Sequence, residues 1–188
     1  LGAVAMFAVC AVRGKSLRLS ARQHGFAALL ALFQFVLNFN LVYRSEAYLA
    51  SGLVSLTFAF LLVANAIFSA LFLGQRVTRR FAVGSGIGLF GVGLLVAPDL
   101  GQPGGAGMAT GLALAFGGVI AASLGNVMQA SAMGRAMPLE AGLAWAMAWG
   151  AVIDAIVAWR VAGPPRFSFD PVYLAGLAYL GIIASAVA

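Results

Sequence analysis

Long apolar stretches alternate along this chain with short segments that contain most of its polar and charged residues. Two apolar runs, Leu1–Val12 and Pro171–Ala188, lie at the two ends of the sequence and are interpreted as parts of further helices. Five others are close to or longer than the roughly 18–20 residues that cross a bilayer as a helix: Phe26–Tyr43, Ala47–Leu73, Phe81–Pro98, Met108–Met133 and Leu139–Trp159. The pattern therefore predicts five membrane spans and two partial ones.

Composition excludes a soluble domain. Hydrophobic residues make up 63% of the chain and charged residues only 9%, with a mean hydropathy of +1.02. So few polar residues cannot cover a water-exposed surface. Inside a bilayer, only helices or a closed barrel satisfy every backbone polar group. Because the runs are long and apolar on all faces, we predict an all-α, polytopic transmembrane helical bundle in contact with the lipid bilayer.

Positive charge is distributed unevenly between the connecting segments. Segments 13–25, 74–80 and 134–138 contain eight of the 11 Lys and Arg residues, and segments 44–46, 98–107 and 160–170 contain three. By the positive-inside rule the first group is predicted to be cytoplasmic, in a bacterial inner membrane. The net charge of +6 therefore reflects basic residues that orient the spans in the membrane. Because these residues do not form a nucleic-acid-binding patch, no nucleic-acid partner is predicted. Tyr43, Tyr48 and Trp159 are expected at the outer interface.

Residues suited to catalysis are scarce. Cys10 is the only cysteine, which excludes an internal disulfide, and it is expected to be a small packing residue. His24 lies in the basic segment and is expected to be solvated. The spans hold no His/Asp/Glu cluster for a metal and no Ser–His or Cys–His arrangement. We therefore predict no cofactor, no metal and no enzymatic activity.

Glycines are concentrated in the span Phe81–Pro98. Gly86-Ile-Gly88-Leu-Phe-Gly91 is a literal G-x-G-x-x-G, but a dinucleotide site needs a preceding strand and a helix that begins in water. Helix packing is the favoured interpretation: Gly84 and Gly88 are predicted to let two helix backbones approach closely. A homodimer that packs through this face is also possible.

Polar side chains recur at helical spacing within the spans. Gln34 and Asn38 share one helix face, as do Asn126 and Gln129, and Ser55 and Asn65 lie on the span between them in sequence. Buried amides either hydrogen-bond between helices or line a wet cavity for a polar solute. For each residue alone, the first interpretation is favoured. As a set on three spans, these six residues are candidates for lining a substrate pathway.

The span Leu139–Trp159 adds aromatic and acidic candidates. Trp145 and Trp149 are four residues apart and could stack on an amphipathic or cationic solute, although packing is the commoner role. Asp154 is the one acidic residue well inside a span, which makes it a candidate for proton coupling. The alternative is that Asp154 reaches interfacial water near the outer end and pairs with Arg160.

Two stretches resemble a known family. Residues 48–65, and residues 72–95 with Gly74-Gln75-Arg76 followed by a glycine-rich helix, are similar to the EamA-like family of the drug/metabolite transporter superfamily. The resemblance implies ten helices in two inverted five-helix repeats. Residues 1–98 would be the first repeat, without its first helix and with a truncated second, 99–107 a periplasmic linker, and 108–188 a truncated second repeat. Gln75 stands where the family usually has glutamate, and Leu62 about where many members have proline.

The function that follows is secondary transport. We predict export of a small metabolite, by alternating access, through a pathway between the repeats; amino acids or related amphipathic compounds are what the resemblance implies. The alternative is a non-transporting membrane protein, either a lipid-modifying enzyme or a scaffold.

Overall fold

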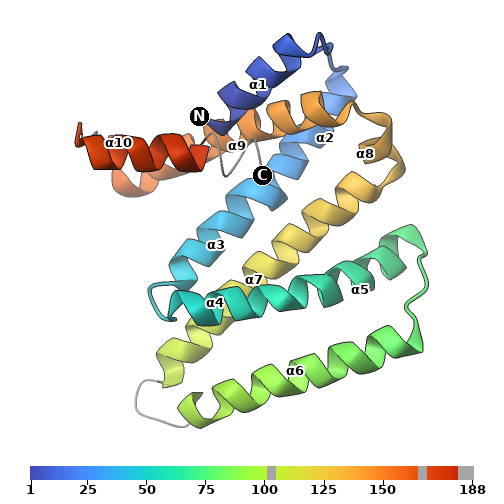
Figure 1. Ribbon diagram of the computed structural model, residues 1–188, viewed down its shortest axis with the longest axis vertical. Helices are drawn as coiled ribbons and strands as arrows, with labels where there is room; N and C mark the ends of the chain where they lie inside the picture. The colour runs from blue at the N-terminus through green and yellow to red at the C-terminus, as the bar shows by residue number, and fades with distance from the viewer. Residues whose placement is uncertain (101–104, 165–168, 182–188) are drawn as a thin grey trace. The chain divides into compact units, whose positions relative to one another are not determined.

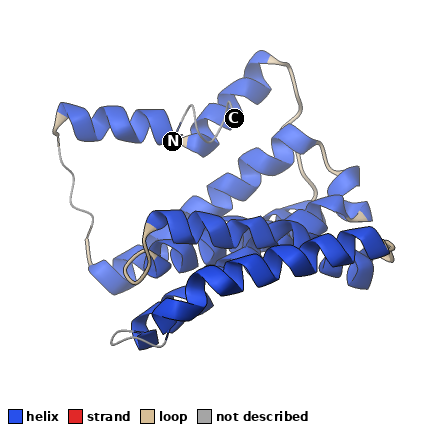
Figure 2. Ribbon diagram, turned by 60° about the horizontal axis from the view of Figure 1, so that its bottom comes forward, coloured by secondary structure: helices blue, strands red, loops and turns tan. Residues whose placement is uncertain are grey.

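The computed structural model describes residues 1–100, 105–164 and 169–181, and the side chains of these residues except 95–100, 105, 106 and 162. Within these ranges the regular structure is helical, and Figure 2 shows no strand there. The elements are α1 (Gly2–Val12), α2 (Ala21–Ala31), the π-helical η1 (Leu32–Leu37), α3 (Asn38–Ser45), α4 (Ser51–Thr57), the 3-10 segment η2 (Phe58–Phe60), α5 (Leu61–Leu73), α6 (Arg79–Leu100), α7 (Gly105–Ala130), α8 (Ala132–Ala136), α9 (Leu139–Ala162) and α10 (Pro171–Ala178).

The chain forms two compact units. One combines Leu1–Leu32 with Ala132–Ala188, and the other is the continuous segment Phe33–Ser131. Each unit takes residues from both predicted repeats. The repeat boundaries at 98 and 108 stay a prediction, although helical backbone enters the predicted linker from both sides, since α6 ends at Leu100 and α7 begins at Gly105.

The first long helical stretch begins earlier than predicted. It runs from Ala21 to Ser45, five residues ahead of Phe26, so the end of the basic segment is helical. A capping box fixes this start: the Gln23 backbone N–H donates to Ser20 Oγ at 3.3 Å, and the Ser20 backbone N–H donates to Gln23 Oε1 at 2.8 Å. Together these bonds satisfy two backbone donors at the helix start.

In the Phe33–Ser131 unit, α7 is the central helix. It packs against α3, α4, α5 and α6 (Figure 1). Helix α5 ends at Leu73 and is capped by Gly74, whose φ of +66° is the left-handed conformation that favours glycine. Residues 75–78 then lead to α6, which begins at Arg79.

Three glycines of α7, spaced seven residues apart, permit its closest packing. A Cβ at Gly111 would lie 2.6 Å from Leu49 Cγ, and one at Gly118 would lie 2.8 Å from Val42 Cγ2. A Cβ at Gly125 would collide with the Gln34 side chain. The segment 34–49 thus runs antiparallel along this face of α7, with its side chains packed into the space that a Cβ at each glycine would occupy.

The close approach predicted for Gly84 and Gly88 is wrong within the described residues. A Cβ at either position would meet nothing within 4 Å. The small-residue face that packs closely is instead on α7, at Gly111, Gly118 and Gly125.

In the other unit, α1 and α2 pack against α9. Arg13 on the connection after α1 lies 3.9 Å from Glu140 at the start of α9. The short helix α8 occupies part of 134–138, which was predicted to be a loop. Helix α10 begins at Pro171, where Asp170 Oδ1 accepts the Val172 backbone N–H at 2.9 Å. The predicted final run beyond residue 181 lies outside the described residues.

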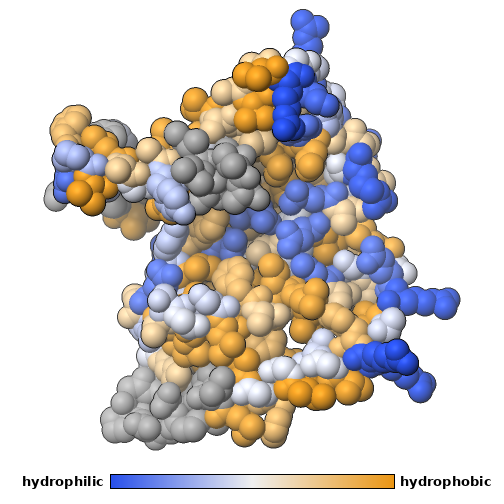
Figure 3. All heavy atoms as spheres, viewed as in Figure 1, coloured by the Kyte–Doolittle hydropathy of each residue, from blue (hydrophilic) through white to orange (hydrophobic). Residues whose placement is uncertain are grey.

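Four helical stretches in the described residues are long and apolar enough to cross a membrane: Ala21–Ser45, Ser51–Leu73, Gly107–Ala130 and Leu139–Val161. The fifth predicted span coincides with α6, but its last side chains lie outside the described residues. Large apolar side chains remain exposed, such as Leu62 at 65% and Ile87 at 68%. Figure 3 shows hydrophobic atoms over much of the visible face, which suits a surface in contact with lipid.

Candidate functional site

The predicted pathway residues are divided between the two units. Gln34, Asn38, Ser55, Asn65, Asn126 and Gln129 belong to the Phe33–Ser131 unit, and Trp145, Trp149 and Asp154 belong to the other. Each group is therefore described within its own unit.

Two of the amides meet across helices. Asn126 Nδ2 on α7 donates to Asn65 Oδ1 on α5 at 3.4 Å, and both side chains are half-buried. Asn65 lies eight residues before the end of α5, or about 12 Å at 1.5 Å per residue. The contact is a long hydrogen bond between two spans, and on α7 it lies four residues before the helix ends at Ala130.

Gln34 and Asn38 both face α7. The Gln34 side chain lies over Gly125, and Asn38 Oδ1 would be 3.5 Å from a Cβ at Gly118. Asn38 is 6% exposed, and its Nδ2 donates to the Gln34 backbone oxygen at 3.3 Å. Gln34 Oε1 and Asn38 Oδ1 are buried without a hydrogen-bond donor among the described residues. A buried acceptor without a partner costs about 1–3 kcal/mol, so both oxygens are strong sites for a donor group.

The amides meet α7 at nearly one level. Gly125, under Gln34, and Asn126, bonded to Asn65, are consecutive residues. Ser123, one turn away, is completely buried, and its hydroxyl has no partner in the described part of the chain. Ser123 lies three residues before Asn126 on α7, and its burial adds it to the pathway candidates that the sequence indicates. We call Gln34, Asn65, Ser123 and Asn126 the polar layer.

The remaining two candidates of this unit, Ser55 and Gln129, have no described hydrogen bond to another helix. Ser55 is exposed, and its hydroxyl donates to the Ser51 backbone oxygen of its own helix at 2.9 Å. Gln129 is half-buried on α7, three residues after Asn126. Ser55 is thus the pathway candidate with the weakest structural support.

In the other unit, His24 is packed and not solvated as expected. Its ring centroid lies 4.5 Å from that of Trp145 and 6.5 Å from that of Trp149, with both pairs edge to face. Its Nδ1 is buried without a partner among the described residues. The expectation was wrong because the capping box carries the helix through His24, which turns this side chain toward α9.

Trp145 is held on several sides. Its Nε1 donates to the Leu17 backbone oxygen at 2.9 Å, and its ring packs edge to face on Phe7 at 5.2 Å. Trp149 is 37% exposed. These contacts show Trp145 fastening the segment before α2 to α9, while Trp149 keeps part of its ring accessible.

Asp154 is half-buried on α9, nine residues after Trp145. At 3.6 residues per turn, nine residues place the two on opposite sides of the helix. A carboxylate at this depth and the Trp145 ring therefore do not share one surface of α9.

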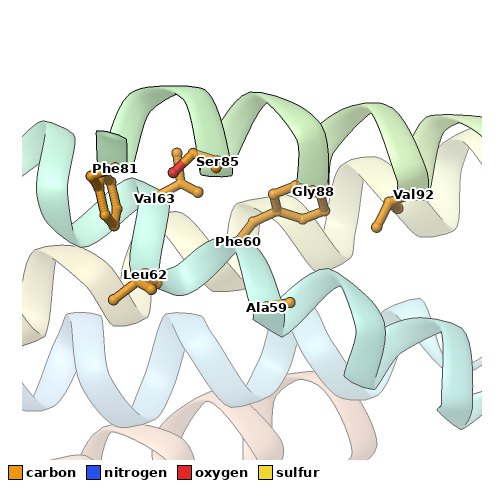
Figure 4. A pocket seen from close by; sticks show the side chains of 9 residues that line it. Ala59, Phe60, Leu62, Val63, Phe81, Ser85, Gly88 and Val92 are labelled. Atoms are coloured by element: carbon orange, nitrogen blue, oxygen red, sulfur yellow. The ribbon is translucent and has the colours of Figure 1, made fainter. Parts of the chain in front are cut away.

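Two cavities of about 340 and 330 Å³ lie in the Phe33–Ser131 unit. The first lies between α6 and the stretch formed by η2 and α5, with Ser85 as the one polar side chain around it (Figure 4). The second is lined mainly by Phe33, Phe72, Leu124 and Met128. Neither is lined by a predicted pathway residue, so both suit apolar occupants.

No group of three or more His, Cys, Asp or Glu side chains that could hold a metal gathers in the described ranges. What the site offers is hydrogen bonding by neutral amides inside apolar spans. Such groups bind and orient a polar solute without reacting with it.

Several long apolar helices joined by short connections, with amide side chains buried or half-buried between them, define an integral, multi-pass membrane protein. The family model of the EamA-like transporter family matches residues 1–97, just over half of the chain. The chain belongs to this family, and thereby to the drug/metabolite transporter superfamily, which confirms the predicted family and the helical fold. No curated protein and no solved structure gives a significant match.

Proposed function

We propose that this chain forms part of a secondary transporter that exports a small polar or amphipathic metabolite, such as an amino acid, across a bacterial inner membrane. The family supplies the transporter class. The polar layer carries the proposal for this chain, because it concentrates neutral hydrogen-bonding groups within otherwise apolar spans. A solute with ammonium or hydroxyl donors would satisfy the Gln34 and Asn38 oxygens.

In this mechanism the polar layer binds the solute, and rearrangement of the helices exposes it to one side of the membrane and then to the other. Neutral amides suit a transporter because they bind a polar solute without the strong attraction of a fixed charge, which would slow its release. Asp154 is proposed as the proton-coupling group, since it is the one acidic side chain well inside a span.

The experiment that tests the proposal is transport by the purified full-length protein that contains this chain, in sealed vesicles. Labelled amino acids and related amphipathic metabolites are loaded inside, and their exit is followed with and without a proton gradient. We expect saturable exit of at least one compound, and loss of that exit in Asn126→Leu. Absence of flux across a broad metabolite panel, with correctly inserted protein, would refute the proposal.

A further inference from the structure

Helix α6 turns one narrow face toward the rest of its unit. Phe81, Ser85 and Val92 are half-buried, whereas the other described side chains from residue 82 to 94 are exposed. With Gly88, these residues are spaced by four, three and four, so they lie on one face of the helix. All four line the 340 Å³ cavity, opposite Phe60 and Val63 (Figure 4).

This cavity has the length of one lipid leaflet. Eleven residues separate Phe81 from Val92, which corresponds to about 16 Å along a helix. The hydrocarbon core of a bilayer is about 30 Å thick, so each leaflet contributes about 15 Å. The groove is long, apolar and inside the membrane-spanning part of the chain, as an extended acyl chain requires.

Positive charge is concentrated at the Phe81 end of the groove. Arg76, Arg79 and Arg80 all lie within five residues of Phe81, and all three are exposed. The ion pair between Arg13 and Glu140 belongs to the other unit and involves none of these three arginines. Figure 3 shows hydrophilic atoms at the right of the view, where α5 ends and α6 begins in Figure 1.

These arginines oppose the electrostatics of their own helix. The start of α6 is marked by Thr78, whose Oγ1 accepts the Phe81 backbone N–H at 3.2 Å. A helix N-terminus has a partial positive charge that favours acidic residues, and arginines there are unfavourable. An anion bound beside Arg79 and Arg80 would offset both the side-chain charges and the helix dipole.

We propose that this groove binds one anionic phospholipid, with its phosphate at the arginine cluster where α6 begins and an acyl chain along the face from Phe81 to Val92. Basic clusters beside transmembrane helices are favourable places for anionic head groups. Guanidinium groups also form paired hydrogen bonds to phosphate oxygens. A lipid in this position would fill the space between α6 and the η2–α5 stretch, and so tie α6 to its unit.

The test is native mass spectrometry of the full chain extracted from vesicles of equal parts phosphatidylglycerol and phosphatidylcholine. We expect wild-type protein to retain one phosphatidylglycerol in preference to phosphatidylcholine. Arg79→Gln with Arg80→Gln should lower that preference at least about tenfold, given the usual contribution of basic residues near a membrane surface. The control pair is Arg44→Gln with Arg160→Gln, which should leave the preference unchanged.

The acyl-chain part of the site is tested separately. Gly88→Leu fills the groove and should abolish retention of phosphatidylglycerol, whereas Gly86→Leu, outside the groove, should not. Gly84→Leu provides a second groove-filling variant if Gly88→Leu is not recovered folded. Millimolar inorganic phosphate should not displace the lipid, because the acyl chain contributes to binding.

Three results would overturn the proposal. They are equal retention of both lipids by wild-type protein, equal effects of Gly88→Leu and Gly86→Leu, and displacement of the lipid by phosphate alone. Crosslinking between two copies through cysteines placed at residue 88 would show that a second chain occupies the groove, and would also refute it.

Discussion

Asn126 Nδ2 on α7 lies 3.4 Å from Asn65 Oδ1 on α5, and this hydrogen bond joins residues 61 positions apart in the sequence. It joins the side chains of two predicted pathway residues on different helices. Interhelical bonds of this kind in membranes contribute only about 0.6 kcal/mol on average. The pair is therefore a weak brace, and a residue can leave it at small cost to bind a solute.

The first prediction separates the role of this pair in stability from its role in binding a solute. Asn65→Ala and Asn126→Ala should each lower the free energy of unfolding in detergent by about 1 kcal/mol or less, with a coupling near 0.6 kcal/mol in the double variant. If the pair lines the pathway, transport should fall by far more than this stability loss explains. Ser51→Ala, at the exposed start of α4, serves as the control. Transport that survives in both Asn variants would leave the pair with a structural role alone.

The second prediction concerns the packing of α7. Gly125→Ala should destabilise the protein by about 1–3 kcal/mol, because the added Cβ would collide with the Gln34 side chain and the helices must separate. Gly86→Ala is the matched control on α6. Since nothing lies within 4 Å of a Cβ there, it should be neutral or stabilise by up to about 1 kcal/mol through helix propensity. Thermal unfolding of both variants, measured in the same detergent, gives the comparison. Equal effects would contradict the close approach of 34–49 to α7.

The sequence predicts the features that depend on residues near one another in the chain, but not the contacts between distant residues. Hydropathy alone locates the helices, because a bilayer requires about 20 apolar residues in a row, and α5 even ends at the predicted Leu73. The same-face placement of Gln34 and Asn38 also follows from helical spacing. Their partner, however, depends on which helix packs opposite, and the pairing of Asn65 with Asn126 is a tertiary contact that spacing does not encode.

Two local features differ in whether the sequence marks them. The Ser20 and Gln23 capping box was present in the sequence and would have moved the helix start to Ala21, and with it His24 into a packed position. In contrast, the 3-10 segment Phe58–Phe60 contains no proline, glycine or polar residue to mark it. Such a segment arises from packing against neighbouring helices, here with Phe60 buried and 5.4 Å from the ring of Phe116.

The third prediction follows from that capping box. Ser20→Ala should cost about 1 kcal/mol of local stability, since the Gln23 N–H loses its acceptor. The loss should appear as faster amide hydrogen exchange at residues 21–24. Ser20→Asp, which restores an acceptor at the N-cap, should return exchange to the wild-type rate. Unchanged exchange in Ser20→Ala would mean that packing of His24 on Trp145, and not the cap, fixes the helix start.

The fourth prediction tests the orientation expected from the arginines. Cys10 is completely buried, so Cys10→Ala provides a background without a native thiol. In that background, Arg76→Cys should react with a membrane-impermeant maleimide from the cytoplasmic side only, and Arg44→Cys from the other side only. Both positions are exposed, so neither result depends on unfolding. Labelling of both from one side would contradict the predicted topology.

The fifth prediction asks whether Asp154 couples transport to protons. Asp154→Asn keeps nearly the same shape but cannot change charge, so it should abolish transport driven by a proton gradient. Exchange of labelled for unlabelled solute at equal concentrations on both sides should persist, because exchange requires binding and helix rearrangement but no net proton movement.

Glu140→Gln is the control, as Glu140 lies at the first turn of α9 and pairs with Arg13. Both kinds of transport should survive in that variant. Loss of exchange in Asp154→Asn would show that Asp154 acts in solute binding or in folding. Gradient-driven transport at the wild-type rate in Asp154→Asn would show that Asp154 does not couple transport to protons.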